Sequence, residues 1–165
     1  MCFVKDTEKG KKHQIAEDDI ECFKLVYRST FCWNWWRSDV MNYKYENGKE
    51  YHLDASPLAL SKLDKRESLE NGVFHSYSTL NQPEITKRLL EDTIEINRLK
   101  RMAEPFKEEG DDYYSIPTNI FCHVIKCIIP KGTPYWYNKR YKTYASTSIR
   151  IVNEIEYNVK IEFNS

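Results

Sequence analysis

The chain has 165 residues, of which 41% are hydrophobic and 30% are charged, and its 25 basic residues balance its 25 acidic ones. This length and composition suit one globular domain with its own core, and they exclude a disordered or fibrous chain. A nucleic-acid binder usually carries a basic excess that releases counterions from phosphates, so no nucleic-acid partner is expected. The apolar runs are far shorter than the ~20 residues of a membrane helix, so no membrane partner is expected either.

The five cysteines are odd in number and form no Cys-x-x-Cys pair. Disulfides belong to oxidising compartments, and the sequence shows no signal-peptide pattern. We therefore expect reduced thiols and a cytoplasmic location.

The beginning of the chain is predicted to be a polar N-terminal arm over residues 1–18, followed by a single domain over residues 19–165. Side chains alternate with a period of two over residues 20–28, which predicts a strand. A second β-favouring run covers residues 31–36 and holds three tryptophans.

Residues 40–53 are predicted to form a β-hairpin that turns at 46–49. The Asn-Gly pair in this turn supplies the positive φ angles that a type I′ turn requires. Tyr43 and Tyr45 are expected to pair across the hairpin with Tyr51.

The middle of the chain is predicted to hold a loop with a short helix over residues 54–71 and a short strand over residues 73–78. One long amphipathic helix follows over about residues 82–104, because Pro83 suits a first helical turn and apolar residues recur at helical spacing.

The last third of the chain is rich in predicted strands. Residues 119–129 form a continuous, largely apolar run, which suits a central strand, and the Pro-Lys-Gly-Thr sequence at 130–133 predicts a turn. Further strands are expected at 135–137, 144–152 and 155–163. The order of elements predicts an α+β fold, with an antiparallel or mixed β-sheet, β-hairpins and one long helix.

Two aromatic clusters are candidates for ligand binding. In a strand, Trp33 and Trp35 share one face and Trp36 takes the other; they either pack in the core or form a stacking platform for a base or sugar. The second cluster is Tyr-Trp-Tyr at 135–137, beside Arg140. Aromatic rings interleaved with cations could hold an anionic ligand that contains a base.

His123 and Cys127 are predicted to share one face of a strand, with Cys122 on the opposite face. Two ligands do not make a zinc site, which needs four, or three and a water. Buried core thiols explain these residues, and a Cys–His nucleophile pair has no supporting motif. No metal and no cofactor are therefore expected.

Several short motifs occur in an order that resembles the ADP-ribosyltransferase fold of the arginine–serine–glutamate type. Arg28 ends a strand, Ser78 and Thr79 match part of a serine motif, and a Pro-Lys-Gly-Thr turn follows. Glu154 and Glu156 form a Glu-x-Glu pair, later in the chain than that family places it, and serines stand nearer the expected position. The resemblance implies NAD as a substrate, held by Arg28 and Ser78, with the glutamates as catalytic residues.

The composition and the Cys-Ile-Ile-Pro-Lys-Gly-Thr segment also resemble small accessory proteins of bacteriophages and mobile elements. The resulting hypothesis is a non-enzymatic binding protein that captures a nucleotide-like small molecule or a host defence protein. Alternatives are an ADP-ribosyltransferase-like enzyme that acts on NAD and a structural or interaction module, and a homo-oligomer stays open. The predicted ligand-binding residues are Arg28, Trp35, Ser78, Tyr135, Trp136 and Arg140.

Overall fold

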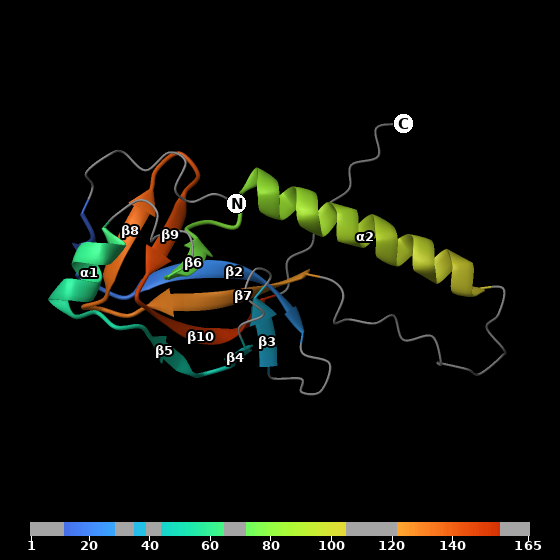
Figure 1. Cartoon of the computed structure of the whole chain (residues 1–165). Helices are drawn as coiled ribbons and strands as arrows, with labels where there is room; N and C mark the ends of the chain where they lie inside the picture. Colours follow the sequence, from blue (N-terminus) through green and yellow to red (C-terminus); the bar gives the residue numbers. More distant parts are fainter. Residues whose placement is uncertain (1–11, 29–34, 39–43, 65–71, 105–121, 156–165) are drawn as a thin grey trace.

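A computed structural model describes residues 12–28, 35–38, 44–64, 72–104 and 122–155 (Figure 1). These residues form an antiparallel sheet and two helices, so the broad α+β prediction is confirmed. The strands are β1 (Gln14–Ile15), β2 (Ile20–Arg28), β3 (Trp35–Ser38), β4 (Lys44–Glu46), β5 (Glu50–His52), β6 (Phe74–Tyr77), β7 (Cys122–Ile129), β8 (Pro134–Asn138), β9 (Thr143–Ser146) and β10 (Ser148–Ile155). The helices are α1 (Pro57–Leu63) and α2 (Pro83–Ala103).

The sheet follows the order β1-β8-β9-β6-β2-β7-β10-β5, with β3 joined to β2 and β4 joined to β3. Its centre is the antiparallel pair β2–β7, in register from Ile20 opposite Ile129 to Tyr27 opposite Cys122. Both strands were predicted from their sequence pattern. The central position of β7 explains its continuous apolar sequence, because both of its faces are covered.

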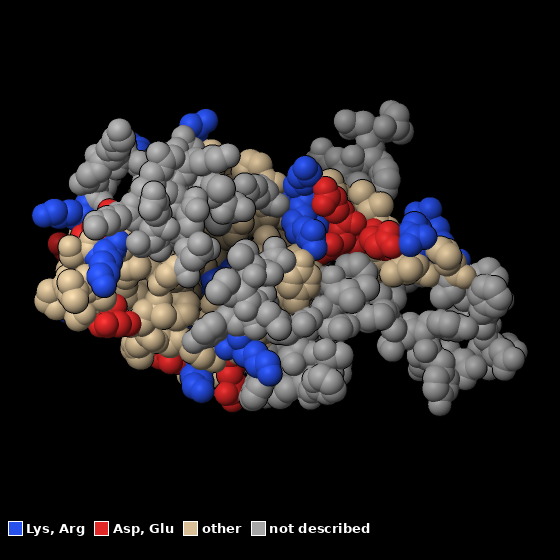
Figure 2. Space-filling model, viewed as in Figure 1, with Lys and Arg blue, Asp and Glu red and all other residues tan. Residues whose placement is uncertain are grey.

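Helix α2 covers one face of the sheet with its first turns. Ile85 and Leu89 are buried against Phe23 and Val124, as the helical spacing of apolar residues predicts. Beyond these turns the helix projects past the sheet (Figure 1). Acidic side chains on α2 lie between basic ones in Figure 2, so the helix presents no uniform basic surface in this view.

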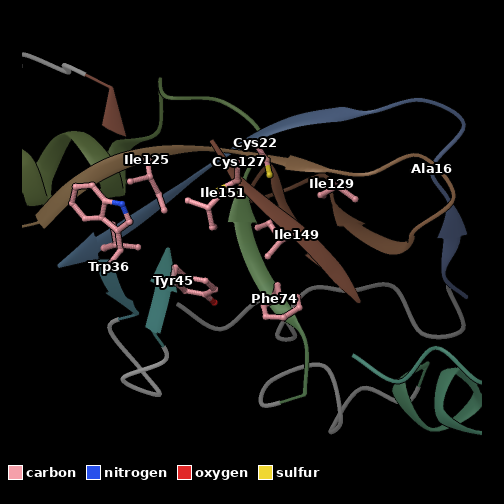
Figure 3. Close-up of a cluster of buried hydrophobic side chains, with 11 residues drawn as sticks. Ala16, Cys22, Trp36, Tyr45, Phe74, Ile125, Cys127, Ile129, Ile149 and Ile151 are labelled. Atoms are coloured by element: carbon pink, nitrogen blue, oxygen red, sulfur yellow. The ribbon is translucent and has the colours of Figure 1, made fainter. Parts of the chain in front are cut away.

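The opposite face of the sheet carries the main core (Figure 3). Cys22 and Cys127 lie side by side at its centre, Trp36 lies at one end and Ala16 at the other. Trp36 is 1% exposed, and its indole Nε1 donates a 2.7 Å hydrogen bond to the Asn47 side-chain oxygen. Trp36 is therefore a core residue, which is one of the two interpretations that its sequence left open.

The turn predicted at 46–49 is present, with the Lys49 N–H donating to the Glu46 carbonyl (3.2 Å), but the predicted pairing of the hairpin's two arms over residues 40–53 is wrong for the described residues. Strand β4 pairs with β3, and β5 pairs with β10. The turn is held by β10, because Gly48 N–H donates to the Ile151 carbonyl (2.8 Å) and Ile151 N–H donates to the Lys49 carbonyl (3.0 Å). Gly48 has a φ of 78°, but Asn47 has no positive φ, so the turn is not type I′. The Tyr45–Tyr51 contact is nevertheless present, with ring centroids 5.3 Å apart.

The described part of the predicted polar arm lies against the sheet. Strand β1 pairs with β8, and Ala16 is 2% exposed. Ala16 N–H donates to the Thr133 carbonyl (3.0 Å), and Gly132 N–H donates to the Ala16 carbonyl (2.8 Å). Two backbone hydrogen bonds thus attach this segment to the predicted turn at 130–133.

Other predicted strands are interrupted or only partly described by the structure. The strand expected at 144–152 is interrupted at buried Thr147, which separates β9 from β10. Residues 156–163 of the expected final strand lie outside the described residues, and so do residues 31–34 of the tryptophan run and 119–121 of the central strand.

Candidate functional site

A hollow of about 200 Å³ is lined by residues of β1, β8 and β9. Strands β8 and β9 lie at the left of Figure 1. Aromatic rings and amines surround the hollow, and none of the described residues that line it is acidic. The lining residues are Lys12, Gln14, Tyr135, Trp136, Tyr137, Lys139 and Tyr144.

Three tyrosines form one wall of this tyrosine hollow. Tyr135 and Tyr137 share a face of β8 because side chains alternate along a strand, and Tyr144 stands opposite Tyr137 on β9. The Tyr144 ring lies 5.0 Å from that of Tyr137 and 5.9 Å from that of Tyr135. Tyr137 is 37% exposed, so part of its ring is available to a ligand.

Polar groups around the tyrosines are positioned to bind an anion. Lys12 and Lys139 are exposed, and their amines add two positive charges. Gln14 accepts a 2.9 Å hydrogen bond from the Tyr135 hydroxyl. Burial, followed by the neighbouring tyrosines, raises the pKa of Tyr144, so its hydroxyl keeps its proton and can donate a hydrogen bond near neutral pH.

A wider hollow of about 750 Å³ continues along β1 and shares Gln14 and Tyr135 with the first. Glu17 and Asp18 line it, together with apolar residues. The Tyr135–Gln14 hydrogen bond therefore lies between a basic and an acidic region.

Trp136 takes the opposite face of β8 from the tyrosines and is 2% exposed. It packs with Leu60 and Leu63 of α1, and its indole Nε1 donates a 3.1 Å hydrogen bond to Asp64. Trp136 is therefore among the lining residues of the hollow, but most of its ring is packed in the core.

The other predicted binding residues near this end of the sheet do not line the hollow. Arg140 is exposed, and its guanidinium lies 5.5 Å from the centre of the Tyr141 ring. The Ser78 hydroxyl donates a 2.8 Å hydrogen bond to the Lys142 carbonyl. Both residues belong to the β6, β8 and β9 region, as Tyr135 and Trp136 do.

Arg28 and Trp35 lie at the other end of the sheet, where Arg28 ends β2 opposite Trp36. Their side chains lie outside the described part of the structure. Ser78 follows Tyr77, which is in register with Phe23. Five residue steps of β2, about 17 Å at 3.3 Å per residue, separate Phe23 from Arg28. The described backbone therefore does not bring Arg28 and Ser78 together.

Glu154 is hydrogen-bonded to His123, with 2.7 Å between the carboxylate oxygen and the ring nitrogen Nδ1. The His123 ring lies 5.6 Å from that of Trp36, so this pair belongs to the end of the sheet away from the hollow. Glu156 lies outside the described residues.

Sequence reasoning did not identify Lys12, Gln14, Lys139 and Tyr144 as site residues. Lys12 and Gln14 fall in the segment predicted as a polar arm, and the tyrosine on β9 has an ordinary strand pattern. Another missed residue is Lys24, which is buried at 8% exposure between Cys22 and Val26 on one face of β2. The sequence feature that could have indicated its burial is the position of a lysine on an otherwise apolar strand face.

The described residues contain no group of three or more histidine, cysteine or acidic side chains arranged to hold a metal ion. None of the helices in the described ranges is long and apolar enough to cross a lipid bilayer. Comparisons with protein-family models, curated proteins and solved structures found no match to this chain.

Proposed function

We propose that this protein is a non-enzymatic binding protein that captures a nucleotide-like small molecule in the tyrosine hollow. The observation that supports this proposal is the combination of three tyrosine rings and two lysines around a space of about 200 Å³, with no acidic side chain among the described lining residues. Aromatic faces accept bases, and ammonium groups bind phosphates.

Each part of such a ligand would have a matching group. The partly exposed Tyr137 ring offers a stacking surface, worth about 1–3 kcal/mol per base. Lys12 and Lys139 would neutralise a phosphate, and the Tyr144 hydroxyl and the Gln14 amide could bond to a base edge or sugar. The resemblance to phage and mobile-element accessory proteins suggests that capture withholds a nucleotide signal from a host defence system.

The alternatives of a host-protein partner and of an ADP-ribosyltransferase-like enzyme acting on NAD are less well supported. The enzyme would bring Arg28 and Ser78 to one dinucleotide, but the residue before Ser78 is in register with Phe23, five residue steps of β2 (about 17 Å) from Arg28. The tyrosine hollow instead forms at the β1 edge without either of them.

Calorimetry with AMP, cyclic AMP, ADP-ribose and NAD tests the proposal. We expect at least one of these ligands to bind, and Tyr137→Ala to weaken its binding about 5- to 150-fold, the equivalent of one stacked base. Tyr137→Phe is the matched control, because it keeps the ring and removes only the hydroxyl. The proposal fails if none of the four ligands binds, or if Tyr137→Ala leaves the affinity unchanged.

A further inference from the structure

The outward face of α2 carries exposed apolar side chains. Ile85 and Leu89 are buried against the sheet. Ile94 comes about two and a half helical turns after Ile85, so it lies on the opposite side of the helix. Ile94 is 56% exposed, and Met102 in the last turn is 58% exposed. Single exposed apolar residues are ordinary on a protein surface, so this face needs a second feature before it indicates a partner.

The second feature is the order of charged residues along the same helix. Glu91 and Glu95 precede Arg98 and Arg101, so acidic residues are followed by basic ones. Figure 2 shows this order along the projecting part of α2. Arg98 bonds to Glu95 within the helix (2.6 Å). Glu91 and Arg101 are exposed, and neither forms an ion pair with another described residue.

This order of charges is complementary to itself when two copies of α2 lie antiparallel. If the two-fold axis passes near residue 96, Glu91 lies level with Arg101 of the second copy, because both are equally far from the axis. The symmetry repeats this contact at the other side of the axis. Ile94 lies level with Arg98 of the second copy, whose aliphatic stem can cover it. A parallel pair in register would instead place like charges side by side, which is unfavourable.

The position of α2 leaves this face accessible to a second copy. Beyond Leu89 the helix projects past the sheet (Figure 1). Its part from Glu91 to Ala103 is about 20 Å long at 1.5 Å per residue. One helix pair of this length offers less contact than the about 1,200–2,000 Å² of a standard stable interface. We therefore expect a weak dimer whose population depends on concentration.

We propose that the outward face of α2 is a self-association surface, which pairs antiparallel with the same face of a second copy of this chain. The pairing covers the exposed apolar residues, and it places the acidic part of each helix beside the basic part of the other. This inference does not rest on the proposed function, because no residue of α2 is among the described residues that line the tyrosine hollow.

Sedimentation equilibrium of the full chain at increasing concentrations tests the proposal. We expect the mass to rise from 19.8 kDa toward twice that value. Ile94→Lys should weaken the dimer about tenfold or more, because it puts a charge at the centre of the interface. The exposed position of Ile94 means that this variant should keep the helix content of the wild type, which circular dichroism checks. A monomer at every concentration, with the face left to another molecule, would overturn the proposal, and so would a dimer that Ile94→Lys does not weaken.

Charge reversal tests the antiparallel arrangement. Glu91→Arg and Arg101→Glu should each weaken the dimer about fivefold or more, because the symmetry reverses two contacts at once. The double variant should recover most of the affinity, since each new arginine then meets a new glutamate of the second copy. Lys131→Glu, at an exposed turn, is the matched control and should leave the dimer unchanged. No recovery in the double variant would overturn the antiparallel pairing.

Nucleotide binding separates this inference from the proposed function. Ile94→Lys should bind nucleotides as tightly as the wild type, because the hollow is lined from β1, β8 and β9. A monomer that binds nucleotides would overturn self-association and leave the proposed function intact. A dimer that responds to the α2 variants but binds no nucleotide would support self-association and reject the proposed function.

Discussion

The two ends of the sheet each hold a tryptophan, a histidine and a carboxylate in contact. Near the hollow, the rings of Trp136 and His13 lie 5.8 Å apart, and His13 Nδ1 lies 3.1 Å from an Asp64 oxygen. At the other end, the rings of Trp36 and His123 lie 5.6 Å apart, and Glu154 lies 2.7 Å from the histidine. Similar residue sets thus occur beside the candidate site and at the end of the sheet away from it.

The two triads differ in what they connect. Asp64 accepts hydrogen bonds from Trp136 Nε1 and from the His13 backbone N–H, and it lies beside the His13 ring. It therefore links the end of α1 to β8 and to the segment that carries Lys12. Trp36 donates to Asn47, outside its own triad, and joins β3 to a turn. We infer that the first triad positions the hollow and that the second only stabilises the fold.

Replacing each tryptophan by alanine gives the largest expected effect. Trp36→Ala and Trp136→Ala should each lower the free energy of unfolding by about 3–5 kcal/mol, because both indoles are buried and their removal leaves a cavity. Urea unfolding followed by circular dichroism measures this loss. Equal losses would fit two core residues, whereas a loss below about 1 kcal/mol for either would contradict its burial.

The carboxylates separate the two triads more sharply. Asp64→Asn weakens several hydrogen bonds at once and should lower the free energy of unfolding by about 1–3 kcal/mol. It should also weaken nucleotide binding, because Lys12 follows the position of His13. Glu154→Gln is the matched control: it should cost about 1 kcal/mol and leave nucleotide affinity unchanged. Weaker binding in Glu154→Gln would contradict the division of roles.

Asp64→Asn should also change how the free energy of unfolding depends on pH. Burial opposes ionisation of Asp64, but the hydrogen bonds from His13 and Trp136 outweigh it, so the pKa of this carboxyl is lowered in the folded protein. A lowered pKa stabilises the fold above the unfolded-state pKa of about 3.9, and this contribution disappears as the pH falls through the folded-state value. Wild type should therefore lose more stability than Asp64→Asn between about pH 5 and pH 3.

Periodic segments were the predictable part of this fold. Strand β2 and helix α2 match their predicted ranges closely, since alternation and helical spacing are properties of the local sequence. The hairpin prediction failed because Gly48 and Lys49 bond to Ile151, about a hundred residues away. No local pattern encodes which strand a turn will join.

The candidate site was predictable only in part. The Tyr-Trp-Tyr run identified β8 and three residues that line the hollow, but alternation alone does not say which face α1 covers, so the burial of Trp136 against α1 could not be predicted. Lys12 enters the site through the pairing of β1 with β8, which joins segments about 120 residues apart, whereas Lys139 directly follows β8. Such residues have no periodicity from which to infer their role.

The two lysines that line the hollow, Lys12 and Lys139, should give the smallest change in nucleotide affinity when they are replaced. Lys12→Ala and Lys139→Ala should each weaken nucleotide binding by up to about fivefold, because exposed ion pairs contribute about 0.2–1 kcal/mol. The double variant should show roughly the product of the two effects if the amines act independently.

Added salt should weaken wild-type binding more than that of the double variant, since screening acts on the charges that the variant lacks. Lys87→Ala, on the exposed surface of α2, should change neither the affinity nor its salt dependence. If the double variant keeps the salt dependence of the wild type, the anionic group of the ligand binds elsewhere. The three tyrosines and the two lysines would then not contact the same ligand.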